Sequence, residues 1–394
     1  MELKYDLFVK KYVVLVLILL IVGCEGTRKS DSKDETFITV DVTKNYPQKD
    51  LILQDFMDVE YITLETTDEF ITQGQVLDIG KEFIVLRNEI SDGDIFIFER
   101  NGKGLRKFNR LGQGGGDYTS ISGIVLDEDN GEIFVNDHPY VHRIPVYDMF
   151  GKFKRVLNHK EGELYVQINN YDDDKLICRH NDVNGRDYQT FSIISKRNGS
   201  TVKEIQIPVY SEKKSTTVRI TSQGDGVIIL GLRHLYPAMI PDHNDWVLVE
   251  HSSDTIYKYL SDNSLYPFIV RVPSIQSMSP EVFLFPGIFT ERYYFMQNLK
   301  KGNDEGYTST ELVYDKEEKN IFKSTVYNDD YTNKSTFSMY SLNANSEVAF
   351  WRKLEAYQLV EAYEKGELKG KLKEIAAGLE EESNPVIMLV KYKK

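Results

Sequence analysis

Cysteine is scarce in this sequence, which has only Cys24 and Cys178 among its 394 residues. Two cysteines exclude a fold that is held together by a disulfide framework. Cys178 lies in a strand-like run at residues 175–179, and we expect it to be a small buried hydrophobic residue.

Positive charge is in deficit as well. The chain has 48 Lys and Arg against 61 Asp and Glu, which gives a formal net charge of -13. Such a surface repels a phosphate backbone, so the composition argues against nucleic acid as a partner.

Long hydrophobic runs are missing too. Residues 13–22 are ten unbroken apolar residues behind Lys10 and Lys11. Ten residues are too few to span a bilayer as a helix, and they suit the apolar region of a signal peptide. The run ends in Ile-Val-Gly-Cys24, which resembles a bacterial lipobox. The sequence therefore predicts a lipoprotein signal peptide at residues 1–23 and a lipid on Cys24, the first residue of the mature protein.

A charged segment follows the predicted lipid site. Residues 25–35 are polar or charged apart from Gly26, so they cannot bury apolar area. We expect residues 24–36 to be a flexible tether between the lipid and the folded part of the chain.

Catalytic signatures are also lacking. The sequence contains no Gly-x-Ser-x-Gly elbow, no paired-carboxylate motif and no His-Glu-x-x-His motif. The glycine-rich stretch at residues 112–116 lacks the Lys-Ser/Thr pair of a phosphate-binding loop. We interpret it as a crossover between blades, in which glycine permits a positive φ.

What the sequence does contain is a repeat. Residues 95–108 and 144–157 follow the same pattern at a spacing of 49 residues, with Gly102 matching Gly151 and Lys103 matching Lys152. A period near 50 residues, built of strand, glycine turn and strand, is typical of a β-propeller blade. About 330 residues from residue 60 onward then predict six or seven blades.

Strand patterns predict further blades along the chain. Blades one to three are predicted within residues 75–108, 123–157 and 164–205, and a short strand is predicted at residues 37–42. For blade four we expect strands at residues 227–231, 246–251, 255–260 and 265–271, with an insert at 234–244. Blade five is expected within residues 282–326. Blade six should begin at residues 336–340 and 347–351, contain a helix at 365–379 with one apolar face, and end in Val386–Tyr392. Residues 60–66 would add its outer strand and close the ring.

The first two blades resemble NHL-type six-bladed propeller repeats. The resemblance rests on Gly102-Lys103, on residues 112–118 and 135–137, and on residues 142–148. The layout is also similar to six-bladed propeller lipoproteins of uncharacterised function from gut Gram-negative bacteria, through the lipobox, residues 60–66 and the tail at 383–386. This resemblance implies the fold and export, and it brings no catalytic residues.

Candidate ligand-binding residues come from the loops of blades two and three. In NHL-like blades the loop at residues 138–142 lies beside the glycine crossover, at one mouth of the central channel. The residues expected there are Tyr118, His138, Tyr140, His142, Arg179, His180 and Asn181. Aromatic, imidazole and amide groups that converge at a funnel suit glycan or peptide recognition. The alternative is that they are solvated loop residues without a role.

The sequence offers two candidate metal sites. His138 and His142 are four residues apart, but no third ligand is obvious and Pro139 favours a loop over a helix. Propeller lactonases, which resemble this architecture, hold a central calcium ion with Glu, Asn and Asp. Possible ligands of that kind are Glu89, Asp92 and Asp137.

The sequence thus predicts an all-β, NHL-like six-bladed β-propeller over residues 37–394, closed by N- and C-terminal strands, with a short helical insertion in the last blade. We expect a lipoprotein of the cell envelope, anchored in the outer membrane by acyl chains such as palmitate, on a side of the membrane that the sequence leaves open. Its expected role is binding of a glycan, a peptide or a protein of an uptake complex, without a cofactor. The alternative is a calcium-dependent hydrolase or lactonase that uses the central channel.

Overall fold

Contacts divide the chain into two units, Met1–Thr36 and Phe37–Lys394. The computed structural model describes residues 37–89, 92–137, 141–182, 190–208, 217–221, 227–232, 235–302, 306–340 and 344–393. Cys24 and the predicted signal peptide and tether lie outside the described residues, and so do His138 and Tyr140.

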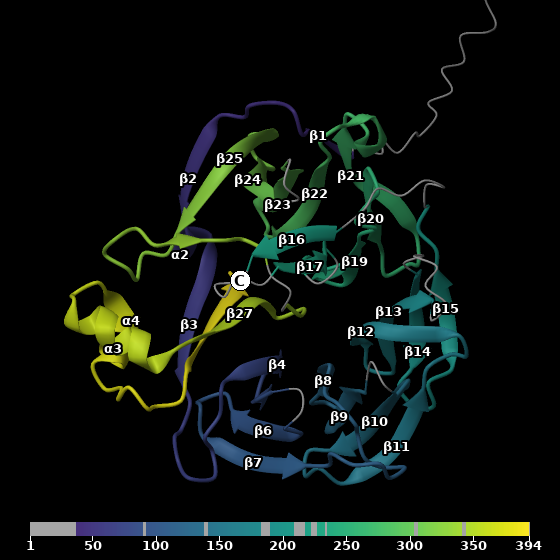
Figure 1. Ribbon diagram of the computed structural model, residues 1–394, viewed down its shortest axis with the longest axis vertical. Helices are drawn as coiled ribbons and strands as arrows, with labels where there is room; N and C mark the ends of the chain where they lie inside the picture. The colour runs from purple at the N-terminus through teal and green to yellow at the C-terminus, as the bar shows by residue number, and fades with distance from the viewer. Residues whose placement is uncertain are drawn as a thin grey trace, which may run out of the picture. The chain divides into compact units, whose positions relative to one another are not determined.

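The second unit is a six-bladed β-propeller, as predicted, and Figure 1 shows its sheets arranged around a centre. Blade one contains β4 (Gln75–Ile79), β5 (Phe83–Arg87), β6 (Asp94–Glu99) and β7 (Gly104–Asn109). Blade two contains β8 (Gly123–Asp127), β9 (Glu132–Asn136), β10 (Arg143–Asp148) and β11 (Phe153–Asn158). Blade three contains β12 (Glu163–Asp172), β13 (Lys175–Asp182), β14 (Thr190–Ser195) and β15 (Thr201–Ile205).

The remaining blades combine distant parts of the chain. Blade four contains β18 (Met239–Asp242), β19 (Asp245–Leu248), β20 (Thr255–Tyr259), β21 (Leu265–Val272) and β1 (Ile38–Asp41). Blade five contains β22 (Val282–Phe289), β23 (Tyr293–Lys301), β24 (Tyr307–Asp315), β25 (Asn320–Tyr327), β2 (Gln48–Ile52) and the short β26 (Thr336–Phe337). Blade six contains β27 (Val348–Leu354), β28 (Val386–Tyr392) and β3 (Met57–Thr63).

The 49-residue repeat is visible in the backbone of blades one and two. Gly102 and Gly151 occupy the same turn position with φ of 89° and 75°, a region that side chains disfavour. The pairing of the last two strands shifts register after Ile97 in blade one and after Val146 in blade two, which are again 49 residues apart. The two segments therefore share a bulge as well as a sequence pattern.

Two strand assignments in the second half are wrong. Residues 227–231 form β17, which pairs with β16 (Thr217–Thr221) in a separate hairpin, and the first strand of blade four is β18 inside the predicted insert. Residues 336–337 pair with β25 of blade five, so they do not begin blade six. Short strands such as β18 and β26 have no clear alternation, and their neighbours decide where they pair.

The N-terminal segment Ile38–Thr63, which we call the N-terminal belt, supplies outer strands to three successive blades. β1 adds parallel to β21, β2 adds parallel to β25, and β3 pairs antiparallel with β28. The short helix α2 (Leu53–Phe56) separates β2 from β3, and its Leu53 is fully buried. The belt thus joins the beginning of the chain to blades built from its second half.

The helical insertion begins earlier than the predicted residues 365–379 and has two parts. They are α3 (Ala356–Glu364) and α4 (Gly370–Ala376). The 3-10 helix η2 (Ile275–Ser277) precedes blade five. Between α3 and α4 the backbone pairs with the loop after β25 through a bridge from Tyr331 to Leu368, and this pairing interrupts the predicted helix. Leu368, Leu372 and Ala376 are buried beside Val386, so the insertion caps blade six. No helix among the described residues is long and apolar enough to cross a membrane.

Asn384 fastens the start of blade one to the end of the chain. Its Nδ2 donates to Glu65 O (2.7 Å) and Phe70 O (2.5 Å), and its Oδ1 accepts from Thr72 N (2.9 Å). The residue is 3 % exposed.

We therefore predict that Asn384→Ala lowers the free energy of unfolding by about 3 kcal/mol or more, because three backbone groups lose their buried partner. Urea denaturation measures this. The exposed Asn333→Ala is the matched control and should change stability by less than about 0.5 kcal/mol. Equal stability of the two variants would contradict the proposed fastening role.

Candidate functional site

Side chains of the inner strands satisfy the backbone of neighbouring blades. Asp78 Oδ2 of β4 accepts a hydrogen bond from Leu126 N of β8 (2.8 Å). From the other side, Asn170 Nδ2 of β12 donates to Leu126 O (2.8 Å). Asn345, before β27, donates from Nδ2 to Ile79 O (2.6 Å). These contacts join blades six, one, two and three around the centre.

A cavity of about 610 Å³ lies between the inner strands. Its wall contains residues of β4, β8 and β12, the turns that follow β4, β8, β12 and β18, and residues 344–347. The lining is rich in carboxylates and amides, and it also includes Trp246 and Trp351. A volume of this size is in the range of small-ligand sites, while the lining is more polar than theirs usually is.

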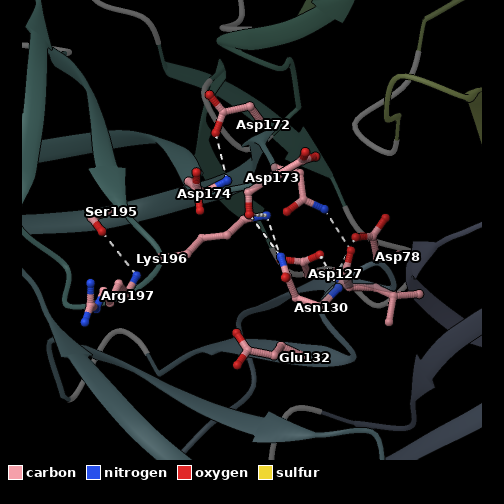
Figure 2. A network of polar contacts seen from close by, with 12 residues as sticks. Asp78, Asp127, Asn130, Glu132, Asp172, Asp173, Asp174, Ser195, Lys196 and Arg197 are labelled. Carbon is pink, nitrogen blue, oxygen red and sulfur yellow. Dashed lines mark hydrogen bonds and ion pairs between the residues drawn. The ribbon is translucent and has the colours of Figure 1, made fainter.

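One wall of the cavity holds a buried ion pair, shown in Figure 2. Lys196 Nζ lies 2.7 Å from Asp127 Oδ2, and both side chains are buried. Asn130 Nδ2 donates to Asp127 Oδ2 (3.0 Å) and to Asp173 O (3.0 Å), which ties blade two to blade three. Because these groups use their hydrogen-bonding capacity on one another, the ion pair has a structural role and offers few free donors or acceptors to a ligand.

Glu128 is also committed to the fold. Its carboxylate accepts hydrogen bonds from the backbone N–H groups of the β4–β5 turn, at Lys81 (2.7 Å), Glu82 (3.0 Å) and Phe83 (2.8 Å). The carboxylate therefore clamps blade two to blade one.

Other acceptors of the lining remain open to a ligand. Asp129 and Asp173 lie in the turns after β8 and β12, and both are exposed. Asn136 Nδ2 donates to Tyr165 O (3.0 Å), while its buried Oδ1 has no hydrogen-bond partner in the described part of the chain. The cavity thus presents acceptors to groups that donate hydrogen bonds, such as hydroxyls, amides and ammonium groups.

Asp78 is the titratable group that the cavity perturbs most clearly. Burial raises the pKa of its carboxyl to about 6, and hydrogen bonds from Leu126 N, Asn345 Nδ2 and Ile79 N oppose this rise. Sequence analysis did not single out Asp78. The only local signal is a carboxylate in the middle of an apolar strand.

The described residues among those predicted from the loops lie at the other end of the blades. Gly123, the first residue of β8, pairs with Asn136, the last residue of β9. The segment after β9 is therefore at the opposite end from the turn that joins β8 to β9. Tyr118, just before β8, is fully buried, and its hydroxyl donates to Gly93 O (2.6 Å) and accepts from Arg110 N (2.9 Å). Tyr118 belongs to the core rather than to a surface that a ligand can contact.

His142 and His180 lie at the two ends of a row of rings. The His142 ring stacks on His159 with centroids 6.0 Å apart, His159 lies 4.3 Å from Tyr165, and Tyr165 lies 5.6 Å from His180. Burial lowers the pKa of His180, and Glu163 Oε2, 3.1 Å from its Nδ1, opposes this. His142 is exposed, Arg179 is buried and Asn181 is half-buried. Sequence analysis missed His159 and Tyr165. His159 matches Arg110 in the 49-residue repeat, and the sequence pattern does not mark this position as a candidate site.

The glycine loop is a crossover from β7 to β8, but the predicted reason for its glycines is wrong. None of its glycines has a positive φ. Asp117 Oδ2 accepts from Gly114 N (2.9 Å), and a Cβ on Gly112 would lie 2.4 Å from the same oxygen. Space for the Asp117 carboxylate therefore favours glycine at positions 112 and 114.

The possible calcium ligands have separate surroundings. Glu89 and Asp92 are exposed between β5 and β6. Asp137 is fully buried, where its Oδ1 accepts from Thr119 N, Thr119 Oγ1 and Ser120 N, and its Oδ2 lies 3.2 Å from Arg143 Nε. Within the described ranges, no three His, Cys, Asp or Glu side chains are grouped so that they could hold a metal ion.

The fold and the lined channel define a β-propeller with a central cavity. A family model described as a 6-bladed beta-propeller, DUF5128, matches residues 27–349, and the chain belongs to this family. No curated protein matches the sequence.

Solved structures with a similar fold include proteins of Bacteroides. A putative exported protein of Bacteroides fragilis superposes with a TM-score of 0.60 at 14% identity, over 91% of this chain and 100% of that chain. A member of the DUF4221 family from Bacteroides vulgatus has a TM-score of 0.45 at 11% identity, over 86% and 99% of the two chains. Virginiamycin B lyase of Staphylococcus aureus has a TM-score of 0.32 at 9% identity, over 65% and 95%. At these identities the first of them supports the fold alone.

The raised pKa of Asp78 predicts a pH dependence of stability. Its ordinary pKa is 3.8 and its folded pKa is about 6, so the folded protein holds this proton more tightly than the unfolded chain. The contribution of Asp78 to stability is therefore largest below about pH 4. It falls by roughly 1.4 kcal/mol per pH unit up to about pH 6 and stays lost above that pH.

Urea denaturation of the wild type and of Asp78→Asn between pH 4 and pH 7 isolates this contribution. Asn cannot titrate, so the wild type should lose stability relative to the variant across this window. Parallel curves for the two proteins would show that the Asp78 carboxyl has an ordinary pKa.

Proposed function

We propose that the protein is an exported lipoprotein of the cell envelope that binds a neutral or cationic polar ligand, an oligosaccharide or a peptide, in its central cavity. The observation that carries this proposal is the cavity of about 610 Å³, whose wall presents the exposed carboxylates of Asp129 and Asp173 and the unpartnered Asn136 Oδ1.

The chemistry of the wall sets the ligand class. Acceptors in a recessed site favour ligands with many hydroxyl or N–H donors, because each donor that leaves water needs a partner. The acidic turns disfavour an anionic ligand, since like charges would be brought together. Oligosaccharides and peptides without acidic side chains satisfy both conditions.

Two observations support export. Lys10, Lys11 and the apolar residues 13–22 precede a lipobox-like Gly23-Cys24, and the solved structure from Bacteroides fragilis carries the description of an exported protein. We propose that acyl chains on Cys24 anchor the protein in the outer membrane, where a captured ligand could pass to an uptake complex. Several acyl chains on one residue give stable anchoring.

Replacing Cys24 tests the anchor. Cys24→Ser should move the protein from the membrane fraction to the soluble fraction of the cell envelope, because the lipid supplies the membrane affinity. Immunoblots of separated fractions measure this, and Cys178→Ser is the control that should remain in the membrane fraction. Membrane retention of Cys24→Ser would contradict lipid anchoring at this residue.

Paired substitutions in the cavity test the ligand site. The probe is a panel of neutral oligosaccharides and of peptides without acidic residues, with binding measured by calorimetry. For ligands that bind the wild type, Asp129→Ala with Asp173→Ala should weaken binding at least about tenfold, because hydrogen bonds to charged groups contribute about 1.5–3 kcal/mol.

Two controls accompany this pair. Glu381→Ala with Glu382→Ala removes the same charge from exposed residues outside the cavity and should leave binding unchanged. His142→Ala probes the loop end that the sequence favoured. Loss of binding in His142→Ala alone, with the cavity pair unaffected, would move the site to that end of the blades.

A further inference from the structure

The outer edges of the six blades differ in how they are covered. In blades four and five, β1 and β2 pair with the outer strands β21 and β25, and in blade six β3 is itself the outer strand. In the described part of the chain, no strand pairs with the outer edge of β7, β11 or β15 (Figure 1). An outer strand of this kind presents N–H and C=O groups that another strand can pair with.

The protein itself shows how such an edge is covered. β1 lies parallel to β21 from Ile38 opposite Ile269 to Asp41 opposite Val272. β2 lies parallel to β25 from Gln48 opposite Lys323 to Ile52 opposite Tyr327. The outer strand of a blade in this fold therefore accepts a parallel extended segment along its length.

The outer strands of blades one and two are rich in basic residues, although the Glu65 carboxylate accepts from Gly104 N (2.8 Å) at the start of β7. The segments 103–111 and 149–158, which contain β7 and β11, include no acidic residue although the chain has 61. Their basic residues, which we call the basic rim, are Lys103, Arg106, Lys107, Arg110, Lys152, Lys154 and Arg155. By contrast, β15 contains Lys203 beside Glu204.

Part of this charge is not neutralised within the protein. Lys107 pairs with Asp94 and Arg155 pairs with Glu132. Lys103 and Lys152, which match in the repeat, are exposed, and neither forms a salt bridge among the described residues. They lie in the turns that lead into β7 and β11.

Exposed apolar side chains accompany these charges. Leu105 of β7 is 42% exposed and Phe153 of β11 is 38% exposed. Phe150 is 67% exposed, and the Arg106 guanidinium lies 4.6 Å from its ring centroid, so blade two contacts β7 at this point. Exposed basic and apolar side chains thus lie together on the two outer strands.

We propose that the outer edges of β7 and β11 are a docking surface for an extended acidic segment of a partner protein, which adds as a parallel strand. Backbone hydrogen bonds supply the pairing, and carboxylates of the segment meet Lys103 and Lys152. The same charges disfavour pairing with a second copy of this chain, because two basic edges repel each other. This surface is on the outside of the blades and is independent of the cavity.

A designed peptide tests the proposal on the full-length protein. The probe is a fluorescent, end-capped peptide of eight alternating Glu and Val residues, with binding followed by fluorescence anisotropy. Lys103→Glu with Lys152→Glu should weaken binding at least about fivefold, because attraction becomes repulsion. The control pair Lys371→Glu with Lys373→Glu makes the same charge change on exposed residues of α4 and should bind like the wild type.

A second probe separates strand addition from charge attraction alone. The same peptide with alternate backbone nitrogens methylated keeps its charge but loses hydrogen-bond donors, and it should bind at least about tenfold more weakly. Equal binding of the methylated peptide, or equal loss in both charge-reversed pairs, would overturn the proposal. Binding of either of two other partners to this surface would also overturn the proposal. These are vesicles of anionic phospholipid that bind through Lys103 and Lys152 in place of the peptide, and a dimer that these substitutions dissociate.

Discussion

The pairing of β3 with β28 is the interaction on which the rest of the ring depends. A circle of sheets built from one chain closes where the two ends of the chain meet, and here they meet inside blade six, where β3 pairs with β28 from Thr63 opposite Val386 to Met57 opposite Tyr392. Asn384 strengthens the junction by holding the backbone of residues 65–72. The cavity is surrounded by inner strands of blades on both sides of this junction, so its shape depends on closure of the ring.

Closure also explains why many polar side chains of the channel form hydrogen bonds with the backbone of the inner strands. Inner strands face a centre where no further strand can pair with them, so their free N–H and C=O groups need side-chain partners. Asp78, Asn170 and Asn345 provide these partners from adjacent blades. The cost of this arrangement is a half-buried carboxylate, and the raised pKa of Asp78 is the consequence. The ligand-facing acceptors are left to the turns, where water and ligand can both reach them.

The sequence predicted the parts of the fold that local rules control. The glycine turns at Gly102 and Gly151 and the apolar runs of β6 and β10 depend on residues close in the chain, so the bounds of blades one and two were predicted to within one residue. β2 reads Gln-Lys-Asp-Leu-Ile and β18 reads Met-Ile-Pro-Asp, and neither has a strong strand pattern. They are strands because β25 and β19 offer them an edge, and such distant pairing leaves no mark in a local window.

The candidate site was harder to predict for the same reason. The repeat indicated which residues occupy loops. Where the cavity lies along the blades depends instead on packing between blades. At the loop end Tyr118 and Tyr165 are fully buried, so large rings fill that space. At the turn end Glu128, Asp129, Asp172 and Asp173 bring like charges together, while Lys196 pairs with Asp127 and Lys175 pairs with Asp172. The Glu128 carboxylate and the Asn130 amide join neighbouring turns at this end through single polar contacts rather than through packed rings, and the polar-lined cavity lies inside them.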